Sequence, residues 1–297
     1  MNKSFILKGV HGDRIYTGCG GYHDSHSETH NIMSAGGTSK YPYYVGVELE
    51  VECNNSECRE WLREVPSNWF YRERDGSLSS SCYGMEIITI PMNPKVAYKE
   101  DTWFDLCDTL KILGATSHDN NRCGLHVHIS KTAFGATEEE RDETISKLIY
   151  MYHYKLSSPS DHLILKVMRR GYSDYCGNII RGLDSKKRSY FEFVKDNGVN
   201  AVDKKYRKDI VKGISKPQRE RYDAINRQNQ YTIEFRQGRG TLNSKSLCAT
   251  IEFCCVLTEF CRVTKAENCT MENFMHKVSK LPKSSCLRNK LFNEGER

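Results

Sequence analysis

A two-residue alternation of apolar and polar side chains recurs in several short segments and limits how this chain can fold. Its clearest example is Cys123–Ser130, in which His126 and His128 alternate with leucine, valine and isoleucine. Because successive side chains of a β-strand point to opposite faces, both imidazoles would lie on one face and the apolar residues would face a core. Two strand histidines can also line a wet surface, so their role depends on what other segments bring beside them.

The segment 41–52 shows the same alternation, with acidic residues at the polar positions. Valine, leucine and tyrosine alternate there with Glu48, Glu50 and Glu52. Like charges at every second position of a strand repel one another, so solvent, a basic group or a bound cation must offset them.

Two further predicted strands carry charge among apolar residues. The segment 85–90 holds Glu86, and a carboxylate in so apolar a strand is costly to bury without a partner. The segment 230–237, the second strand of a predicted hairpin, directs Glu234 and Arg236 to one face. Antiparallel sheets tolerate one polar face over a helix-backed core, so these side chains converge if the four strands share a sheet.

Helical periodicity predicts the layer behind that sheet. A capping box at Thr137–Glu140 marks the start of one helix. The last thirty residues predict a weak helix and a polar tail. The stronger predicted helices cover residues 57–65, 96–113, 137–157 and 244–263.

Composition narrows the function classes. With 297 residues, of which 28% are charged, the chain fits a soluble globular protein, and its net charge of +6 is too mild to indicate nucleic-acid binding. Glutamates interrupt its most apolar helix and no signal peptide is evident, so we expect a cytoplasmic protein with no membrane span. Thirteen cysteines without a Cys-X-X-Cys pair are expected to be free thiols.

The predicted organisation is one large domain with two flanking segments. Residues 1–40 form a polar arm, residues 41–265 the main domain, and residues 266–297 a C-terminal helix and tail. A basic insert at about 186–221 is either a solvated face or a groove for an anionic substrate. The arm holds ligand types suited to Zn²⁺ in a spacing that matches no standard finger, namely Cys19, His23, His26 and His30.

Taken in order, the polar segments resemble those of the amidoligases, relatives of glutamine synthetase and the glutamate–cysteine ligases. The resemblance covers roughly residues 41–265 and implies an α+β, glutamine synthetase-like fold, a curved and mostly antiparallel sheet backed by helices. It is carried by Val45–Glu50, Asp75–Leu78 with Gly84–Ile88, Cys123–Ser130, and Thr232–Arg236 with Gly240–Asn243.

The resemblance also implies two sites for Mg²⁺ or Mn²⁺. His128 would approach the phosphates of ATP, and Arg236 would contact the transferred phosphoryl group or the substrate carboxylate. The implied metal ligands are Glu50, Glu86 and Asp75 at the first site, and Glu48, His126 and Glu234 at the second.

The implied reaction is ATP-dependent amide formation between a carboxylate substrate and an amine substrate, through an acyl phosphate. A small molecule, a peptide or a protein could supply the amine, and a homo-oligomer is left open. Two other readings of the residues compete with it. One is a metal-dependent hydrolase that uses the histidines and acids around an activated water. The other is a binding or structural module without activity.

Overall fold

The computed structural model describes residues 43–67, 69–74, 78, 83–118, 122–156, 163–173 and 222–292. The predicted N-terminal arm with its zinc-ligand types, the basic insert at 186–221 and Asp75 lie outside the described residues.

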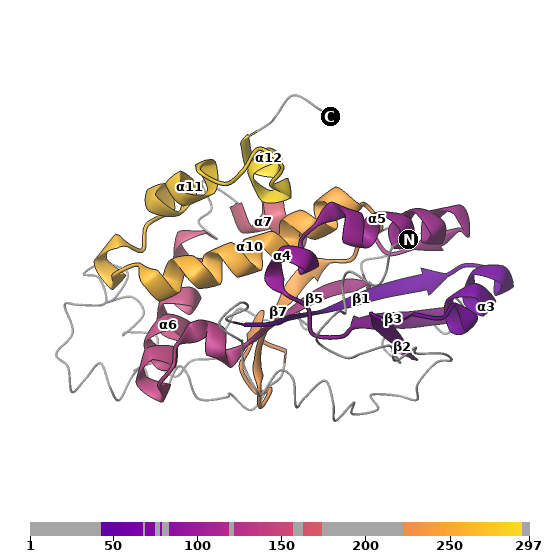
Figure 1. Ribbon diagram of the computed structural model, residues 1–297, viewed down its shortest axis with the longest axis horizontal. Helices are drawn as coiled ribbons and strands as arrows, with labels where there is room; N and C mark the ends of the chain where they lie inside the picture. The colour runs from indigo at the N-terminus through magenta and orange to yellow at the C-terminus, as the bar shows by residue number, and fades with distance from the viewer. Residues whose placement is uncertain are drawn as a thin grey trace.

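The described residues contain one antiparallel sheet of seven strands (Figure 1). Its order is β2-β3-β1-β5-β7-β6, and β4 pairs with β1 beside this path. The strands are β1 (Val45–Cys53), β2 (Phe70–Arg74), β3 (Tyr83–Thr89), β4 (Ala115–Thr116), β5 (Gly124–Ser130), β6 (Ile225–Asn226) and β7 (Thr232–Arg239).

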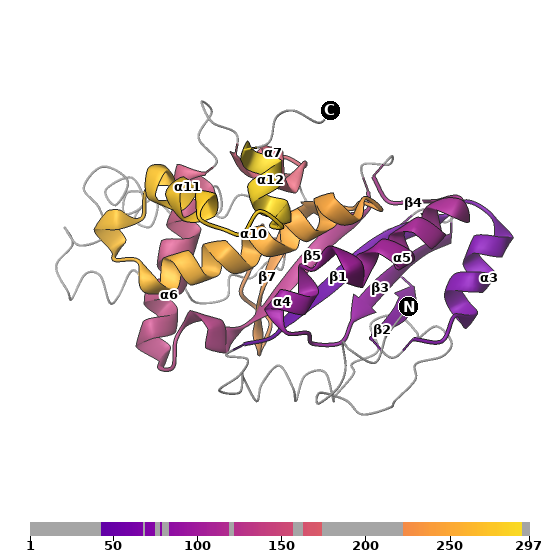
Figure 2. The same ribbon diagram turned by 45° about the horizontal axis from the view of Figure 1, so that its top comes forward.

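Helices cover one face of this sheet, with α10 as the long central helix (Figures 1 and 2). α10 contacts most of the other helices, including the C-terminal pair. A π-helical turn (Met151–Lys155) continues α6, and two short 3₁₀ helices cover Lys131–Phe134 and Ala266–Asn268. The α-helices are α3 (Ser56–Glu64), α4 (Pro94–Ala97), α5 (Glu100–Ile112), α6 (Glu138–Tyr150), α7 (Leu163–Met168), α10 (Ser244–Val263), α11 (Met271–Ser279) and α12 (Cys286–Phe292).

The core lies between the helices and the apolar face of the sheet. Leu49, Ile87 and Val127 come from three neighbouring strands and are fully buried, as are Ile251 and Phe253 of α10. Burying one such side chain contributes about 1.5–3 kcal/mol, so the alternation that puts these residues on one face drives the sheet against the helices. The alternate positions consequently project from the other face.

The predicted fold class is confirmed at the level of an antiparallel sheet backed by helices, but two predicted helices differ from the structure. The segment 96–113 is divided into α4 and α5, because side chains of α5 satisfy the carbonyl groups that end α4. Trp103 Nε1 donates to Ala97 O at 2.7 Å, and Thr102 Oγ1 donates to Val96 O at 2.8 Å. The C-terminal segment holds two helices, α11 and α12, instead of one weak helix.

The ten described cysteines are free thiols, and the other three of the thirteen lie outside the described residues. Within the same residues, no helix has both the length and the apolarity of a membrane-spanning segment.

Candidate active site

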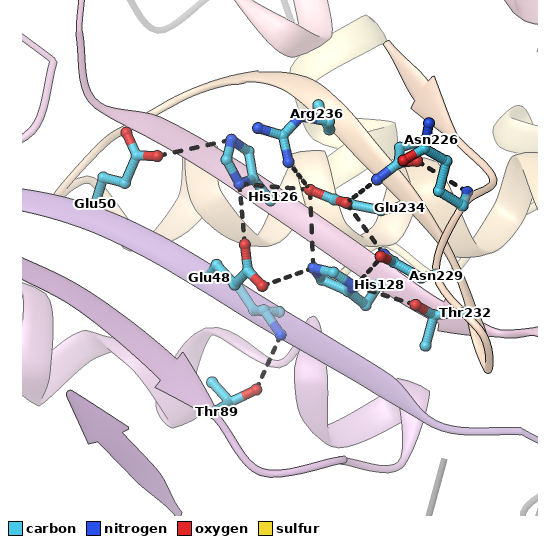
Figure 3. Close-up of polar contacts among 12 residues, drawn as sticks. Glu48, Glu50, Thr89, His126, His128, Asn226, Asn229, Thr232, Glu234 and Arg236 are labelled. Atoms are coloured by element: carbon cyan, nitrogen blue, oxygen red, sulfur yellow. Dashed lines mark hydrogen bonds and ion pairs between the residues drawn. The ribbon is translucent and has the colours of Figure 1, made fainter. Parts of the chain in front are cut away.

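The strand register gathers predicted polar residues on the face of the sheet opposite the helices (Figure 3). Glu48 of β1 is the register partner of His126 on β5, and His128 is the partner of Glu234 on β7. Paired residues of antiparallel strands project to the same side. Side chains from distant segments therefore converge without any loop having to position them.

Glu48 lies between the two histidines. Its Oε1 is 2.9 Å from His128 Nε2, and its Oε2 is 3.0 Å from His126 Nδ1. Each oxygen of one carboxylate thus faces a different imidazole, as Figure 3 shows. This arrangement makes Glu48 the common member of the cluster.

Glu234 forms the second acidic centre on this side of the sheet. Its Oε1 accepts a hydrogen bond from Arg236 Nη1 and lies 3.6 Å from His126 Nδ1 and 3.9 Å from His128 Nε2. Its Oε2 accepts hydrogen bonds from Asn226 Nδ2 at 2.7 Å and Asn229 Nδ2 at 3.1 Å. Both oxygens of the carboxylate therefore accept hydrogen bonds, and the residue is almost completely buried.

Glu50 approaches the cluster from the far side of His126. It accepts a hydrogen bond from the backbone N–H of Gly124 at 2.5 Å, and its Oε1 is 3.8 Å from His126 Nε2. A Cβ atom at Gly124 would stand 2.8 Å from His126 Nε2 and 3.3 Å from Glu50 Oε2. Only glycine at this position lets the imidazole and the carboxylate lie this close to the strand.

The acidic side of the cluster extends across β3 to β2. Glu86 is directly opposite Glu50 on β1 and opposite Glu73 on β2. All three carboxylates are buried. The register therefore places three like charges side by side, where they repel one another.

Charge coupling perturbs the pKa of several groups in the cluster. Burial favours neutral forms, but the carboxylates of Glu48 and Glu234 outweigh it at His128 and raise the pKa of that imidazole to about 9. Burial likewise opposes the charge on Glu48, yet His128 and His126 keep the pKa of that carboxyl well below its usual range. The pKa of Glu234 is also lowered, because His128 and Arg236 outweigh burial. In the absence of a bound ion, the carboxylates and His128 therefore stabilise each other's charged forms.

Two groups of side chains could each hold a divalent ion. In each group the candidate ligand atoms lie within 4.8 Å of one another. Glu48 belongs to both, whereas the resemblance divides Glu48 and Glu50 between the two sites. The groups are Glu48, Glu86 and His126, and Glu48, His128 and Glu234.

A cavity of about 280 Å³ opens beside Glu48 and His128. Its walls include Tyr71, Ile88 and the hairpin residue Tyr231. No lysine or arginine belongs to the described residues that line it. The cavity therefore combines a largely uncharged wall with one imidazole and one carboxylate at its inner end.

Sequence reasoning missed Asn226, Asn229 and Glu73. The asparagines lie in a two-residue strand and in the turn after it, where alternation gives no signal. Glu73 follows the alternation of β2 and could have been recognised from it. Asp75, which the resemblance also implies as a ligand, lies outside the described residues.

Comparison with known proteins identifies the family of this chain. A family model described as "Putative amidoligase enzyme" matches residues 26–258, which is most of the chain. Comparisons with curated proteins and with solved structures found no match.

Proposed function

This chain belongs to the amidoligase family, and on that premise we propose that it is an ATP-dependent ligase that joins a carboxylate to an amine. The observation that carries the proposal is the position of Glu48, whose two oxygens face His126 and His128 separately. A metal-dependent ligase needs such a preorganised set of charged ligands more than it needs a protein nucleophile.

The donor set fits Mg²⁺ or Mn²⁺. Each of the two groups offers two carboxylates and one imidazole, a hard, oxygen-rich set that these ions accept. Glu48 would contribute to both ions, Glu86 and His126 to one, and His128 or Glu234 to the other. When bound, the ions would neutralise the charge of the nucleotide phosphates.

Arg236 is suited to bind a negatively charged group that takes part in the reaction. Its Nη1 is anchored on Glu234, and its Nε is buried with no hydrogen-bond partner among the described residues. A guanidinium held in this way can bind the transferred phosphoryl group or the substrate carboxylate through short, charge-assisted hydrogen bonds. His128 would lie beside the nucleotide phosphates as a ligand of the second ion, and its Nε2 would lose its proton when that ion binds.

We assign the cavity beside His128 to the nucleoside part of ATP. Its aromatic and aliphatic walls suit a flat base, and its threonine, asparagine and glutamine side chains offer hydrogen bonds. The phosphates of a nucleotide seated there would extend past His128 toward Glu48. The carboxylate substrate would then lie on the side of Arg236.

The proposed reaction has two steps. The substrate carboxylate attacks the γ-phosphorus of ATP, which forms an acyl phosphate and releases ADP. The amine then attacks the acyl carbon, which forms the amide, releases inorganic phosphate and loses one proton. Both steps depend on holding charged groups in line and on keeping water away from the acyl phosphate.

Hydroxylamine offers a test that does not require the natural amine. The protein is incubated with ATP, Mg²⁺, a pool of carboxylic acids and hydroxylamine, and hydroxamates are detected by mass spectrometry. We expect hydroxamate and phosphate to form together, and only with ATP present. Phosphate release that is independent of the carboxylates, or hydroxamate formation without ATP, would contradict the proposal.

A further inference from the structure

We propose that Asn226 and Asn229 are positioning residues that orient Glu234 and His128 for a divalent ion, an inference that rests on the proposed metal-dependent function. Both belong to the β6–β7 hairpin and its turn. Neither is among the residues that the family resemblance implies for the site. Their side chains act on the ligands and not on a substrate.

The first part of the inference is that the two oxygens of Glu234 have separate roles. Oε2 accepts both carboxamide N–H groups, whereas Oε1 faces Arg236 and the two imidazoles. A carboxylate with one oxygen occupied by two donors presents the other oxygen in a fixed direction. Oε1, which accepts one hydrogen bond from Arg236, is therefore the oxygen that would face the ion.

Asn226 is itself held in one orientation. Its Oδ1 accepts the backbone N–H of Gln228 at 2.9 Å, so its amide nitrogen must point toward Glu234. The residue is buried, and it is the register partner of Glu234 across β6 and β7. The carboxamide therefore bridges the turn and the ligand with no freedom to rotate.

The second part concerns the ring of His128. Its Nδ1 lies 3.2 Å from Thr232 Oγ1 and 3.5 Å from Asn229 Nδ2, while its Nε2 faces Glu48. Contacts at Nδ1 fix the plane of the imidazole and leave Nε2 as the metal-facing atom. Asn229 thus contacts two candidate ligands at once.

A purely structural role would be stabilisation of the hairpin turn. Asn226 serves the turn through Oδ1, whereas its Nδ2 donates to Glu234 Oε2. Asn229 Nδ2 donates to Glu234 Oε2 and lies 3.5 Å from His128 Nδ1. The two roles can therefore be separated, because a turn contact would affect folding and a ligand contact would affect ion affinity.

The test is Mn²⁺ binding to the metal-free full-length protein, followed by electron paramagnetic resonance. Asn226→Ala and Asn229→Ala should each weaken one Mn²⁺ site by about 10–100-fold, the usual effect of losing a ligand-orienting partner. Gln228→Ala is the matched control, since it keeps the backbone N–H that Asn226 accepts, and it should bind Mn²⁺ like the wild type. Unfolding curves confirm that each variant is folded.

A second measurement does not depend on the ion. In metal-free protein, ¹H–¹⁵N spectra of the His128 ring report the surroundings of each ring nitrogen. Asn229→Ala should shift the His128 Nδ1 resonance, and Gln228→Ala should not. Folded asparagine variants that bind two Mn²⁺ ions with wild-type affinity would overturn the inference, as would an unchanged Nδ1 resonance in Asn229→Ala.

The two measurements distinguish this inference from the proposed function. If the wild-type protein binds no Mn²⁺, the metal-dependent ligase is contradicted, and the positioning of an ion ligand is contradicted with it. If the wild type binds Mn²⁺ in a Glu48-dependent way and both asparagine variants do the same, only the positioning role fails.

Discussion

Glu48 Oε1 and His128 Nε2 lie 2.9 Å apart, and this contact joins the neighbouring strands β1 and β5 through their side chains. The opposite oxygen of the same carboxylate meets His126. Removing the Glu48 charge should therefore disturb both imidazoles together, which makes this residue the most informative one to change.

Glu48→Gln should abolish the stabilisation that Mn²⁺ gives to the folded protein. An ion that binds only the folded state adds about 2.7 kcal/mol to the free energy of unfolding at a hundred times its dissociation constant. Thermal unfolding with and without Mn²⁺ measures this difference. Glu60→Gln, which changes an exposed acid of α3, is the control and should keep the full effect. Equal Mn²⁺ stabilisation of Glu48→Gln and wild type would contradict the metal assignment.

Gly124→Ala should displace His126 while leaving the protein folded. The new Cβ would stand 2.8 Å from His126 Nε2, closer than such atoms approach, and the end of that side chain is what must move. We expect at least about a tenfold loss of Mn²⁺ affinity, as for other changes that misplace a ligand.

Gly46→Ala is the matched glycine variant on β1. Its Cβ would be 3.6 Å from His128 Cβ, an ordinary van der Waals contact, so Mn²⁺ affinity should stay near that of the wild type. Calorimetric titration of both proteins gives the comparison. Equal losses of Mn²⁺ affinity in the two variants would show that the close contact between position 124 and His126 does not determine ion binding.

His153 should make the protein less stable in mild acid. The ring is buried against Tyr172, with Nδ1 2.8 Å from the Tyr172 hydroxyl, and burial lowers the pKa of this histidine from 6.5 to about 3. Between these values the unfolded chain binds a proton that the folded protein does not. The free energy of unfolding should therefore fall as the pH drops below 6.5, by up to about 1.4 kcal/mol per pH unit.

Urea unfolding of wild type and His153→Gln between pH 6 and 4.5 isolates this contribution. Above pH 4.5 most carboxylates remain ionised, and His128, whose pKa is raised, is protonated in the folded protein throughout this range. The free energy of unfolding should fall more steeply with decreasing pH in the wild type than in His153→Gln. Equal pH dependence of the unfolding free energy in the two proteins would show that His153 is not its source.

Glu252 should hold the C-terminal helix α12 in place. Its Oε2 accepts the buried backbone N–H of Leu287 at 2.9 Å, so Glu252→Ala leaves a helix N-terminus unsatisfied. We expect a loss of about 1–3 kcal/mol in the free energy of unfolding. Glu252→Gln keeps an acceptor oxygen, and because burial raises the pKa of Glu252, a neutral side chain should be tolerated better. Equal losses in the two variants would contradict this role.

The alternation of side chains was enough to predict which strands share a polar face. Glu48, His126 and Glu234 lie in the strands and on the face expected from their sequence positions. The exact pairing was not predictable, because a period of two specifies a face and not a register. For the same reason the position of Glu48 between both histidines, with one oxygen toward each, became visible only in the structure.

Other features depend on individual side-chain contacts that neither alternation nor helical periodicity indicates. No local pattern could divide the helix at residues 96–113, since the break is stabilised by the buried indole of Trp103. Asn226 and Asn229 reach Glu234 only once β6 and β7 pair as a hairpin.

The source of the oxygen in the released phosphate tests the central claim most directly. The protein is incubated with ATP, Mg²⁺, amines and a pool of ¹⁸O-labelled carboxylic acids in unlabelled water, and the phosphate is analysed by mass spectrometry. An acyl phosphate transfers one carboxylate oxygen to phosphorus, so we predict phosphate carrying one ¹⁸O atom from wild type and none from Glu48→Gln. Wild-type protein that releases only unlabelled phosphate would show that water attacks ATP, and would contradict the ligase.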